Sequence, residues 1–298
     1  MFFSIYFHFN SLMLTFVLIN EYTILVFYSM KFKRTLSTLS FLFVTLLLFS
    51  KYITQADFSL KKENNISGLS TKKIELPKPL NDRSEVILHR KGYTVSYNSK
   101  NKIPNWVAWE LTPKRLEERY SRTNKFLPDP DIQKPVTSDD YKGAHIDRGH
   151  MCPAGDNRWD KQAMMESFYM TNICPQDHNL NRGDWKELEE ACRLWAQKEG
   201  RIYIVCGPIL YNQNHRTISK QRIVVPEAFF KVVLCMGKHP KAIGFIHKNT
   251  PGNRPLDSYV NSIDEVERIT GIDFFPSLPD ELEKNVEKQC NLQQWKRQ

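Results

Sequence analysis

The residues best able to do chemistry centre on the tetrapeptide Asp147-Arg148-Gly149-His150. His150, with an ordinary pKa of about 6.5, can accept a proton at neutral pH. Arg148 lies two positions earlier, so on an extended backbone its cation and the imidazole face the same side and can share one phosphate. Gly149 between them would let the backbone come close to a substrate. A base beside a fixed cation favours the hydrolysis of phosphodiesters, which needs a base for water and positive charge for the phosphorane.

A candidate metal ligand lies about thirty positions later. Asn181 offers a hard amide oxygen, which suits a heavily hydrated Mg²⁺ better than zinc. A metal bound there would contact the scissile phosphate and the leaving oxygen. Glu189 would lie roughly 12 Å further along a continuous helix, so we expect it to hold water around the metal rather than bind the metal directly.

A strand and a helix must position these groups. Four apolar residues recur at intervals of three, four and three positions: Trp185, Leu188, Cys192 and Trp195. This spacing predicts one buried face of a helix. Asp184 and Glu187 fit a capping box at its start, which would place Asn181 at or just before the first turn.

Apolar runs elsewhere predict an antiparallel sheet. The runs that read as strands are residues 86–89, 93–97, 106–111, 201–206, 229–235 and 242–246. The first two would form a hairpin, and Gly207-Pro208 is expected to stop the fourth. Ser262 and Glu265 have the spacing of a capping box for a helix that Gly271 can end.

The first 56 residues predict a segment that the mature protein lacks. Residues 30–56 have the cationic start, the apolar run and the small residue before a cleavage site that are typical of a secretory signal peptide. The apolar run of 14 residues, 36–49, is short of the roughly 20 that a spanning helix needs, although an uncleaved anchor stays open. Met30 is a plausible start, which would make residues 1–29 an upstream extension. We therefore expect an exported, periplasmic or extracellular protein without stable membrane association after cleavage.

The rest of the chain predicts one domain behind a short lead-in. Residues 57–84 are polar and lysine-rich, and we expect a flexible segment there. Residues 85–298 contain all the predicted strands and helices. The chain has 298 residues, 42 Lys and Arg against 33 Asp and Glu, and a net charge of +9. This excess favours polyanionic partners such as nucleic acid or acidic lipid, but only as support.

The cysteines allow three further interpretations. The chain has six: Cys152, Cys174, Cys192, Cys206, Cys235 and Cys290. In an exported protein they could form disulfides, for which 15 full pairings exist, and those within apolar strands could equally be buried thiols. Cys152, Cys174 and His178, with His150 nearby, could alternatively be drawn as zinc ligands of a structural module, although their spacing fits no compact knuckle.

Three motifs together resemble one known family. They are Asp-Arg-Gly-His at 147–150, Asn-Ile-x-Pro-Gln at 172–176, and Leu-Asn-x-Gly-x-Trp-x-x-Leu-Glu at 180–189. In this order and spacing they resemble the DNA/RNA non-specific endonucleases, the His-Me finger (ββα-metal) nucleases that include endonuclease G. The resemblance spans roughly residues 86–275. It implies an α+β fold with a central antiparallel sheet flanked by helices, and Mg²⁺-dependent cleavage of DNA and RNA in which Mn²⁺ can substitute.

The resemblance also implies roles for individual residues. His150 would be the general base, Arg148 a phosphate-binding cation and Asn181 the metal ligand. Glu189 would be the acid of the water network, and Asn172 would orient the site.

Three further assignments complete the predicted site. The family has another arginine upstream of an Asp-Pro step, for which Arg122 is the nearest match, with a spacing that differs by a residue or two. Asp147 would brace its own turn by a backbone hydrogen bond, or act behind the groups that touch substrate. Three cations of the helix region would contact substrate phosphates or merely solvate the helix: Arg182, Lys186 and Arg193.

The sequence thus predicts an exported endonuclease that cleaves DNA and RNA. A nucleic-acid-binding protein on the same scaffold, with catalysis lost, is the alternative. A homodimer is left open.

Overall fold

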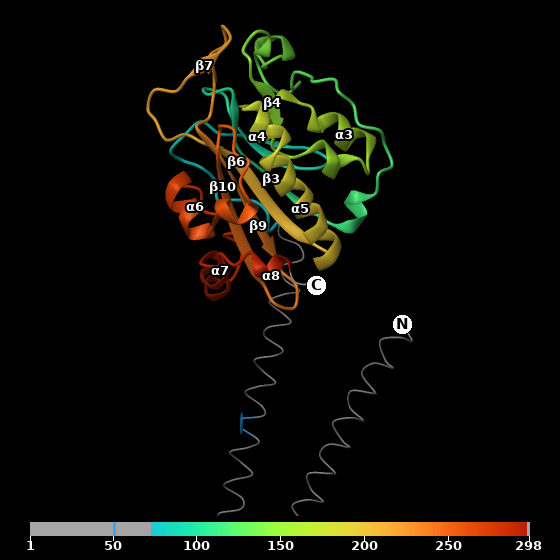
Figure 1. Ribbon diagram of the computed structural model, residues 1–298, viewed down its shortest axis with the longest axis vertical. Helices are drawn as coiled ribbons and strands as arrows, with labels where there is room; N and C mark the ends of the chain where they lie inside the picture. The colour runs from blue at the N-terminus through green and yellow to red at the C-terminus, as the bar shows by residue number, and fades with distance from the viewer. Residues whose placement is uncertain (1–49, 52–72, 297–298) are drawn as a thin grey trace, which may run out of the picture. The chain divides into compact units, whose positions relative to one another are not determined.

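A seven-stranded antiparallel sheet forms the centre of the chain (Figure 1). The computed structural model describes residues 50–51 and 73–296. In order across the sheet the strands are β1 (Val86–His89), β2 (Thr94–Asn98), β3 (Ile103–Leu111), β6 (Ile202–Ile209), β9 (Ala228–Cys235), β10 (Lys241–Lys248) and β11 (Val260–Asn261). Each strand is antiparallel to its neighbours, so the predicted antiparallel sheet is confirmed.

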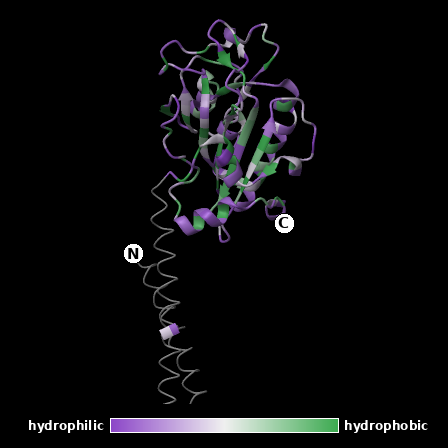
Figure 2. Ribbon diagram, turned by 90° about the vertical axis from the view of Figure 1, so that its left-hand side faces the viewer, coloured by the Kyte–Doolittle hydropathy of each residue, from purple (hydrophilic) through white to green (hydrophobic). Residues whose placement is uncertain are grey.

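Both faces of this sheet are covered, which explains why its strands are continuous apolar runs. On β9, Phe229 and Val233 face one core cluster, whereas Phe230 and Val232 face another. The first cluster packs under α5 (Asp184–Glu199), and the second packs under α6 (Ile263–Thr270) and α7 (Asp280–Glu287). Figure 2 shows hydrophobic residues gathered on the sheet and hydrophilic residues on the outer loops.

A second, two-stranded sheet lies on the α5 side and carries the tetrapeptide. Its strands are β4 (Asp147–His150) and β5 (Ile173–Gln176), paired antiparallel with Asp147 opposite Gln176. After β5 the chain enters the short α4 (His178–Arg182) and then α5. Strand, strand and helix therefore follow one another in the order that the ββα pattern predicts.

The remaining elements are short. The helices are α3 (Lys161–Ser167) and α8 (Gln293–Lys296), and the strands are β7 (Thr217–Ile218) and β8 (Ile223–Val224). The 3-10 turns are η1 (Pro113–Leu116), η2 (Ser138–Tyr141), η3 (Ala154–Asn157), η4 (Met170–Asn172) and η5 (Leu256–Tyr259).

The predicted strands all form, and two of their ends differ from the prediction by three residues. The third strand begins at Ile103 rather than at 106. The fourth does not stop at Gly207-Pro208 but continues to Ile209, with Pro208 opposite Phe229. Its register with β3 runs from Ile202 to Cys206, and Pro208 is paired with β9 alone. A proline is tolerated there because its missing N–H removes no bond from the interior of the sheet.

The helix of the predicted site is broken where the sequence predicted continuity. Asn181 lies inside α4, and Gly183 separates α4 from α5. The predicted capping box of Asp184 and Glu187 is wrong: the N-cap is Gly183, without a side-chain cap, and the Asp184 carboxylate accepts a hydrogen bond from the Tyr259 hydroxyl instead. The predicted apolar face of α5 is confirmed, since all four of its residues are buried.

The C-terminal helix signals are also confirmed. Ser262 Oγ accepts a hydrogen bond from the Glu265 amide at 3.2 Å and so caps α6. Gly271 ends the helix with a left-handed backbone, φ 69°, which favours glycine.

The structure settles the cysteine alternatives. All six cysteines are free, and five of them are buried. The zinc alternative is wrong, because within residues 73–296 these cysteines and histidines do not gather into a group able to hold a metal. Cys152 instead accepts a hydrogen bond from Asn157 at 3.2 Å, and His178 pairs with Asp147.

Most of the N-terminal predictions lie outside the described residues. These are the upstream extension (1–29), the signal peptide (30–56, apart from the helical residues 50–51) and the first part of the lead-in (57–72). In the described part of the lead-in, Ile74 is buried in the second core cluster. Among the described helices, none has the length and apolarity that crossing a bilayer would require.

Candidate active site

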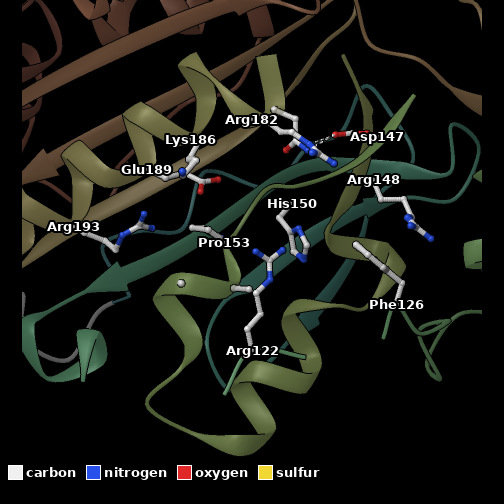
Figure 3. A pocket seen from close by; sticks show the side chains of 13 residues that line it. Arg122, Phe126, Asp147, Arg148, His150, Pro153, Arg182, Lys186, Glu189 and Arg193 are labelled. Carbon is white, nitrogen blue, oxygen red and sulfur yellow. Dashed lines mark hydrogen bonds and ion pairs between the residues drawn. The ribbon is translucent and has the colours of Figure 1, made fainter. Parts of the chain in front are cut away.

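A cavity of about 580 Å³ lies where β4, α4 and α5 meet. It contains six of the seven residues predicted from sequence: Arg122, Asp147, Arg148, His150, Asn181 and Glu189. The seventh, Asn172, is fully buried and does not line the cavity. Figure 3 shows the cavity with His150 in the middle and Glu189 projecting from α5.

His150 ends β4 and lies in an aromatic setting. Its ring is 4.7 Å from the Phe168 ring, edge to face, and 5.3 Å from the Phe126 ring. Burial, with the charges of Arg122 and Arg148, lowers the pKa of His150 to about 3. The imidazole is therefore neutral at physiological pH, the form that can accept a proton. Its Nε2 is buried and has no hydrogen-bond partner among the described residues.

Two arginines flank this imidazole, but unequally. In Figure 3 the Arg122 guanidinium lies beside the imidazole, and it also stacks over the Phe168 ring at 5.7 Å. Arg148 lies at the edge of the cavity, stacked over Phe126 at 4.4 Å and donating to Ser138 Oγ. Arg122, the weaker assignment from sequence, is thus the cation nearer to the histidine.

The structure gives a reason for glycine at position 149 that differs from the predicted one. A Cβ at this position would lie 2.1 Å from Gln176 Oε1, on the strand opposite. The glycine therefore allows Gln176 to pack across the hairpin, and close approach of a substrate to this backbone stays a prediction.

Asn172 acts through the backbone next to His150. Its Oδ1 accepts from the Cys152 amide at 2.9 Å, while its Nδ2 donates to the carbonyls of Cys152 and Ser167, each at 2.8 Å. A buried amide with three satisfied bonds fixes the chain directly after the histidine. This position fits the predicted orienting role.

Asp147 holds α4 rather than its own turn. Its Oδ2 accepts from Asn181 Nδ2 at 2.8 Å, its Oδ1 contacts His178 Nδ1 at 3.1 Å, and Arg182 Nε is 3.7 Å away. Partial burial acts to raise the pKa of Asp147, but these three partners outweigh it and lower the pKa. The predicted backbone brace is therefore wrong, and Asp147 sets the orientation of Asn181.

That orientation is the test of whether the site suits a metal. Because Asn181 Nδ2 donates to Asp147, its Oδ1 is left free of hydrogen bonds among the described residues. A free amide oxygen, with the Glu189 carboxylate in the same cavity, is a donor set that hard cations such as Mg²⁺ prefer. These residues fit a divalent metal, with Asn181 as the residue that would hold it.

Replacing Asp147 with alanine should weaken metal affinity by about 10- to 100-fold, the usual effect of removing a group that orients a ligand. The maximal rate at saturating metal should change much less. The measurement is cleavage rate against Mg²⁺ concentration. Asp139→Ala, which removes only an exposed carboxylate paired with Lys142, is the matched control. An unchanged Mg²⁺ curve in Asp147→Ala would contradict the orienting role.

Glu189 projects into the cavity from α5, and its burial disfavours the ionised form of its carboxyl group. Burial raises the pKa of Glu189 to about 7, against the opposing charges of Lys231 and Arg193. Such a carboxyl stands near the midpoint of its titration at neutral pH, a condition common at functional sites.

Two buried charged groups near the cavity, those of Lys231 and Asp156, were not predicted from the sequence. Lys231 on β9 is 1% exposed, and its ammonium lies 4.2 Å from the Trp185 ring centroid and 5.9 Å from that of Trp109. Asp156 is equally buried, and it accepts from Trp109 Nε1 at 3.1 Å and from Arg193 at 3.2 Å. A lysine inside the apolar run 229–235 was the one available signal, because lysine is almost never fully buried without a partner.

The three cations of the helix region all line the cavity, and each has an acidic partner. Arg182 pairs with Asp147, Lys186 lies 3.6 Å from Glu190, and Arg193 pairs with Asp156. With Arg122 and Arg148 they make five cations in the lining of the cavity against two carboxylates, so the lining is basic, as binding of a polyanion requires.

Comparison with known proteins identifies the family. A sequence model described as DNA/RNA non-specific endonuclease matches residues 70–281. The chain belongs to the DNA/RNA non-specific endonuclease family. The resemblance predicted from the three motifs is confirmed, and this family comprises metal-dependent nucleases that hydrolyse the phosphodiester bonds of nucleic acids.

Individual relatives agree with this placement. "Nuclease EXOG, mitochondrial" of Danio rerio is 35% identical over 206 residues, which cover 63% of this chain and 60% of the relative. "Nuclease" of Nostoc sp. is 30% identical over 219 residues, covering 69% and 78% respectively. The chain spans about 60% of the length of the EXOG relatives. A crystal structure of the EndoG/EndoGI complex has a TM-score of 0.65 at 23% identity, covering 72% of this chain and 93% of that chain, and this likeness confirms the α+β fold.

The prediction of an exported protein is wrong. The EXOG and Endonuclease G relatives and the Schizosaccharomyces pombe relative are all named as mitochondrial. A cationic leader poor in acids is shared by secretory signals and organelle targeting sequences, so the pattern at 30–56 did not separate them.

Proposed function

We propose that this chain is a Mg²⁺-dependent endonuclease that hydrolyses phosphodiester bonds of DNA and RNA, with His150 as the general base. The observation that carries the proposal is the meeting of a neutral buried imidazole, two guanidinium groups and a free amide oxygen in one cavity. A divalent metal bound at Asn181 would offset the charge that develops on the scissile phosphate and the leaving oxygen.

Each protein group has a separate role in the proposed reaction. Neutral His150 takes a proton from water as the water oxygen attacks phosphorus, the bond to the leaving oxygen breaks, and that oxygen takes a proton from solvent. The nearby arginine charges disfavour the protonated imidazole of His150. The negative charge of the bound phosphate offsets these charges, so the imidazole can accept the proton. Arg122 and Arg148 bind the non-bridging oxygens, so the phosphate is held before the proton moves.

The contacts proposed for the rim of the cavity explain why both DNA and RNA are expected substrates. The rim cations contact phosphate rather than bases, and phosphate contacts carry no sequence information. Arg182, Lys186 and Arg193 supply these contacts on the α5 side of the cavity. Cleavage of DNA and RNA with little sequence preference is the expected result, and a homodimer stays a prediction.

Digestion with and without a chelator tests the proposal. The purified chain is incubated with plasmid DNA and with RNA in Mg²⁺, in Mn²⁺ and in EDTA. We expect both nucleic acids to be cut in either metal and to stay intact in EDTA. Retarded but uncut nucleic acid in Mg²⁺ would contradict the proposal and identify a binding protein on a nuclease scaffold.

The charge of Glu189 predicts a pH-dependent change in stability. The pKa of about 7 lies above the ordinary 4.5, so the folded state binds the proton more tightly and stability falls as pH rises from 4.5 through 7. Glu189→Gln keeps the shape and removes this loss. In EDTA at pH 8 the variant should be more stable than the parent by about 1–3 kcal/mol, and the difference should vanish near pH 4.5.

Urea unfolding at the two pH values measures this difference. Glu190→Gln, on the exposed face of the same helix, is the matched control and should show no such pH dependence. Equal stability of Glu189→Gln and the parent at pH 8 would mean that the carboxylate is not strained. In Mg²⁺ the same variant should cleave more slowly, because it loses the charge proposed to order water.

A further inference from the structure

Three carboxylates gather on the sheet face opposite the cavity. Asp264 and Glu267 come from α6 and Glu287 from α7, and one oxygen of each lies within 4.8 Å of the others. Both helices pack on the second core cluster through Val266 and Val286, whereas the active-site helix α5 packs on the first. This group is therefore separate from the proposed nuclease site.

Glu287 gives the cluster its unusual character. The residue is only 7% exposed, and its Oε1 is buried without a hydrogen-bond partner among the described residues. Leaving an ionised carboxylate buried and unpaired costs several kcal/mol, so such a group either keeps its proton or holds a cation. Glu283 Oε1, one helical turn earlier, is buried and unpartnered in the same way.

The surrounding charges make the cost larger. Burial raises the pKa of Glu287 to about 8, and the neighbours Glu267, Glu283, Asp264 and Asp273 all act in the same direction. The pKa of Glu267 is raised to about 7, although the Phe274 amide donates to its Oε1 at 2.7 Å. Lys78, a cation that acts against the raised pKa of Glu283, is mostly exposed and pairs with Asp273 at 3.3 Å.

We propose that Asp264, Glu267 and Glu287 form a second divalent-cation site, suited to Ca²⁺, that ties α6 to α7. Ca²⁺ takes six to eight oxygen ligands at about 2.3–2.6 Å, so oxygens on opposite sides of the ion are up to about 5 Å apart. The spread of the three oxygens, within 4.8 Å, suits this ion. Mg²⁺ usually keeps several waters and binds through one or two carboxylates, so a group of three carboxylates favours Ca²⁺.

The site does not follow from membership of the family. The family model ends at residue 281, so the ligand at 287 lies beyond the matched segment. Two acids from α6 and one from α7 would cross-link the two helices that cover this face. Binding there would stabilise the C-terminal layer and leave the chemistry of the cavity unchanged.

Calcium titration of the full chain tests the proposal. All variants carry Asn181→Ala, which removes the proposed ligand of the active-site metal. At pH 8, calorimetry should show one Ca²⁺ per chain in this background, and Ca²⁺ at 100 times Kd should raise Tm by about 5–10 °C. Adding Glu287→Gln should weaken binding at least tenfold and remove the rise in Tm. Adding Glu281→Gln, an exposed acid on the same helix, should change neither.

A second variant and a pH series provide two further tests of the proposed Ca²⁺ site. Asp264→Asn, at the exposed member of the cluster, should also weaken Ca²⁺ binding, and it serves if Glu287→Gln does not fold. In chelator, Tm of the Asn181→Ala protein should fall as pH rises from 6 to 9, and Ca²⁺ should restore it. Absence of Ca²⁺ binding, binding unaffected by the cluster variants, or a fall in Tm that Ca²⁺ does not restore would each overturn the proposal, the last by showing protonated acids instead of a cation site.

Discussion

Replacing His150 with alanine should lower kcat on DNA and on RNA by about 10²- to 10⁴-fold, the usual effect of losing a general base. The imidazole has the low pKa and the place in the cavity that this role needs. KM should change little, because Arg122 and Arg148 still bind the phosphate. Initial rates in saturating Mg²⁺ measure the effect.

The controls must separate chemistry from packing. His150 contacts the Phe126 and Phe168 rings, so its removal leaves a void in that wall. Circular dichroism and a thermal melt should show that the variant folds. Free imidazole should partly restore the rate by occupying the void, whereas His239→Ala, on an exposed loop, should cleave normally. A folded His150→Ala protein with a near-normal rate would end the assignment of the base.

Most residues that line the cavity could be predicted because they lie in short motifs. His150, Arg148 and Asn181 each lie in a run whose neighbours fix its place on a strand or a helix turn. The structure accordingly brings all three to one cavity. Their roles remain predictions until the variants are measured.

The environment of the site could not be predicted, because it comes from remote segments. The low pKa of His150 depends on burial between Phe126 and Phe168 and on Arg122, none of which neighbours it in sequence. Lys231 reaches the cavity side from the middle of the sheet, and a strand pattern does not specify which face meets α5. Tertiary packing decides both.

Local signals failed where tertiary contacts offered a better partner. Asp184 looked like a helix cap, but it bonds the Tyr259 hydroxyl from 75 positions away. Gly207-Pro208 looked like a strand end, but β9 continues to pair with it. In both cases the local pattern indicated the structure that the isolated segment favours. In the folded protein a residue or strand from a distant part of the chain offers a different partner, which no local pattern specifies.

Replacing Asn181 with alanine should lower the cleavage rate at fixed Mg²⁺ by about 10²- to 10³-fold. The metal's stabilisation of charge in the transition state is worth several kcal/mol, and each 1.4 kcal/mol is about tenfold in rate. Raising the Mg²⁺ concentration should recover part of the loss, because the alanine removes a ligand and leaves His150 and the arginines in place. Rate against Mg²⁺ concentration is the measurement.

Asn181→Asp distinguishes loss of the ligand from loss of the structure around it. The aspartate keeps a hard oxygen for the metal, but it replaces the Nδ2 donor that lies 2.8 Å from Asp147 with a second negative charge. Its rate should therefore lie between those of the parent and Asn181→Ala, with a higher Mg²⁺ requirement than the parent. Asn179→Ala, an exposed residue on the same helix, should match the parent. If Asn181→Ala follows the parent's Mg²⁺ curve, the metal is held by another residue, and the free amide oxygen has no part in the reaction.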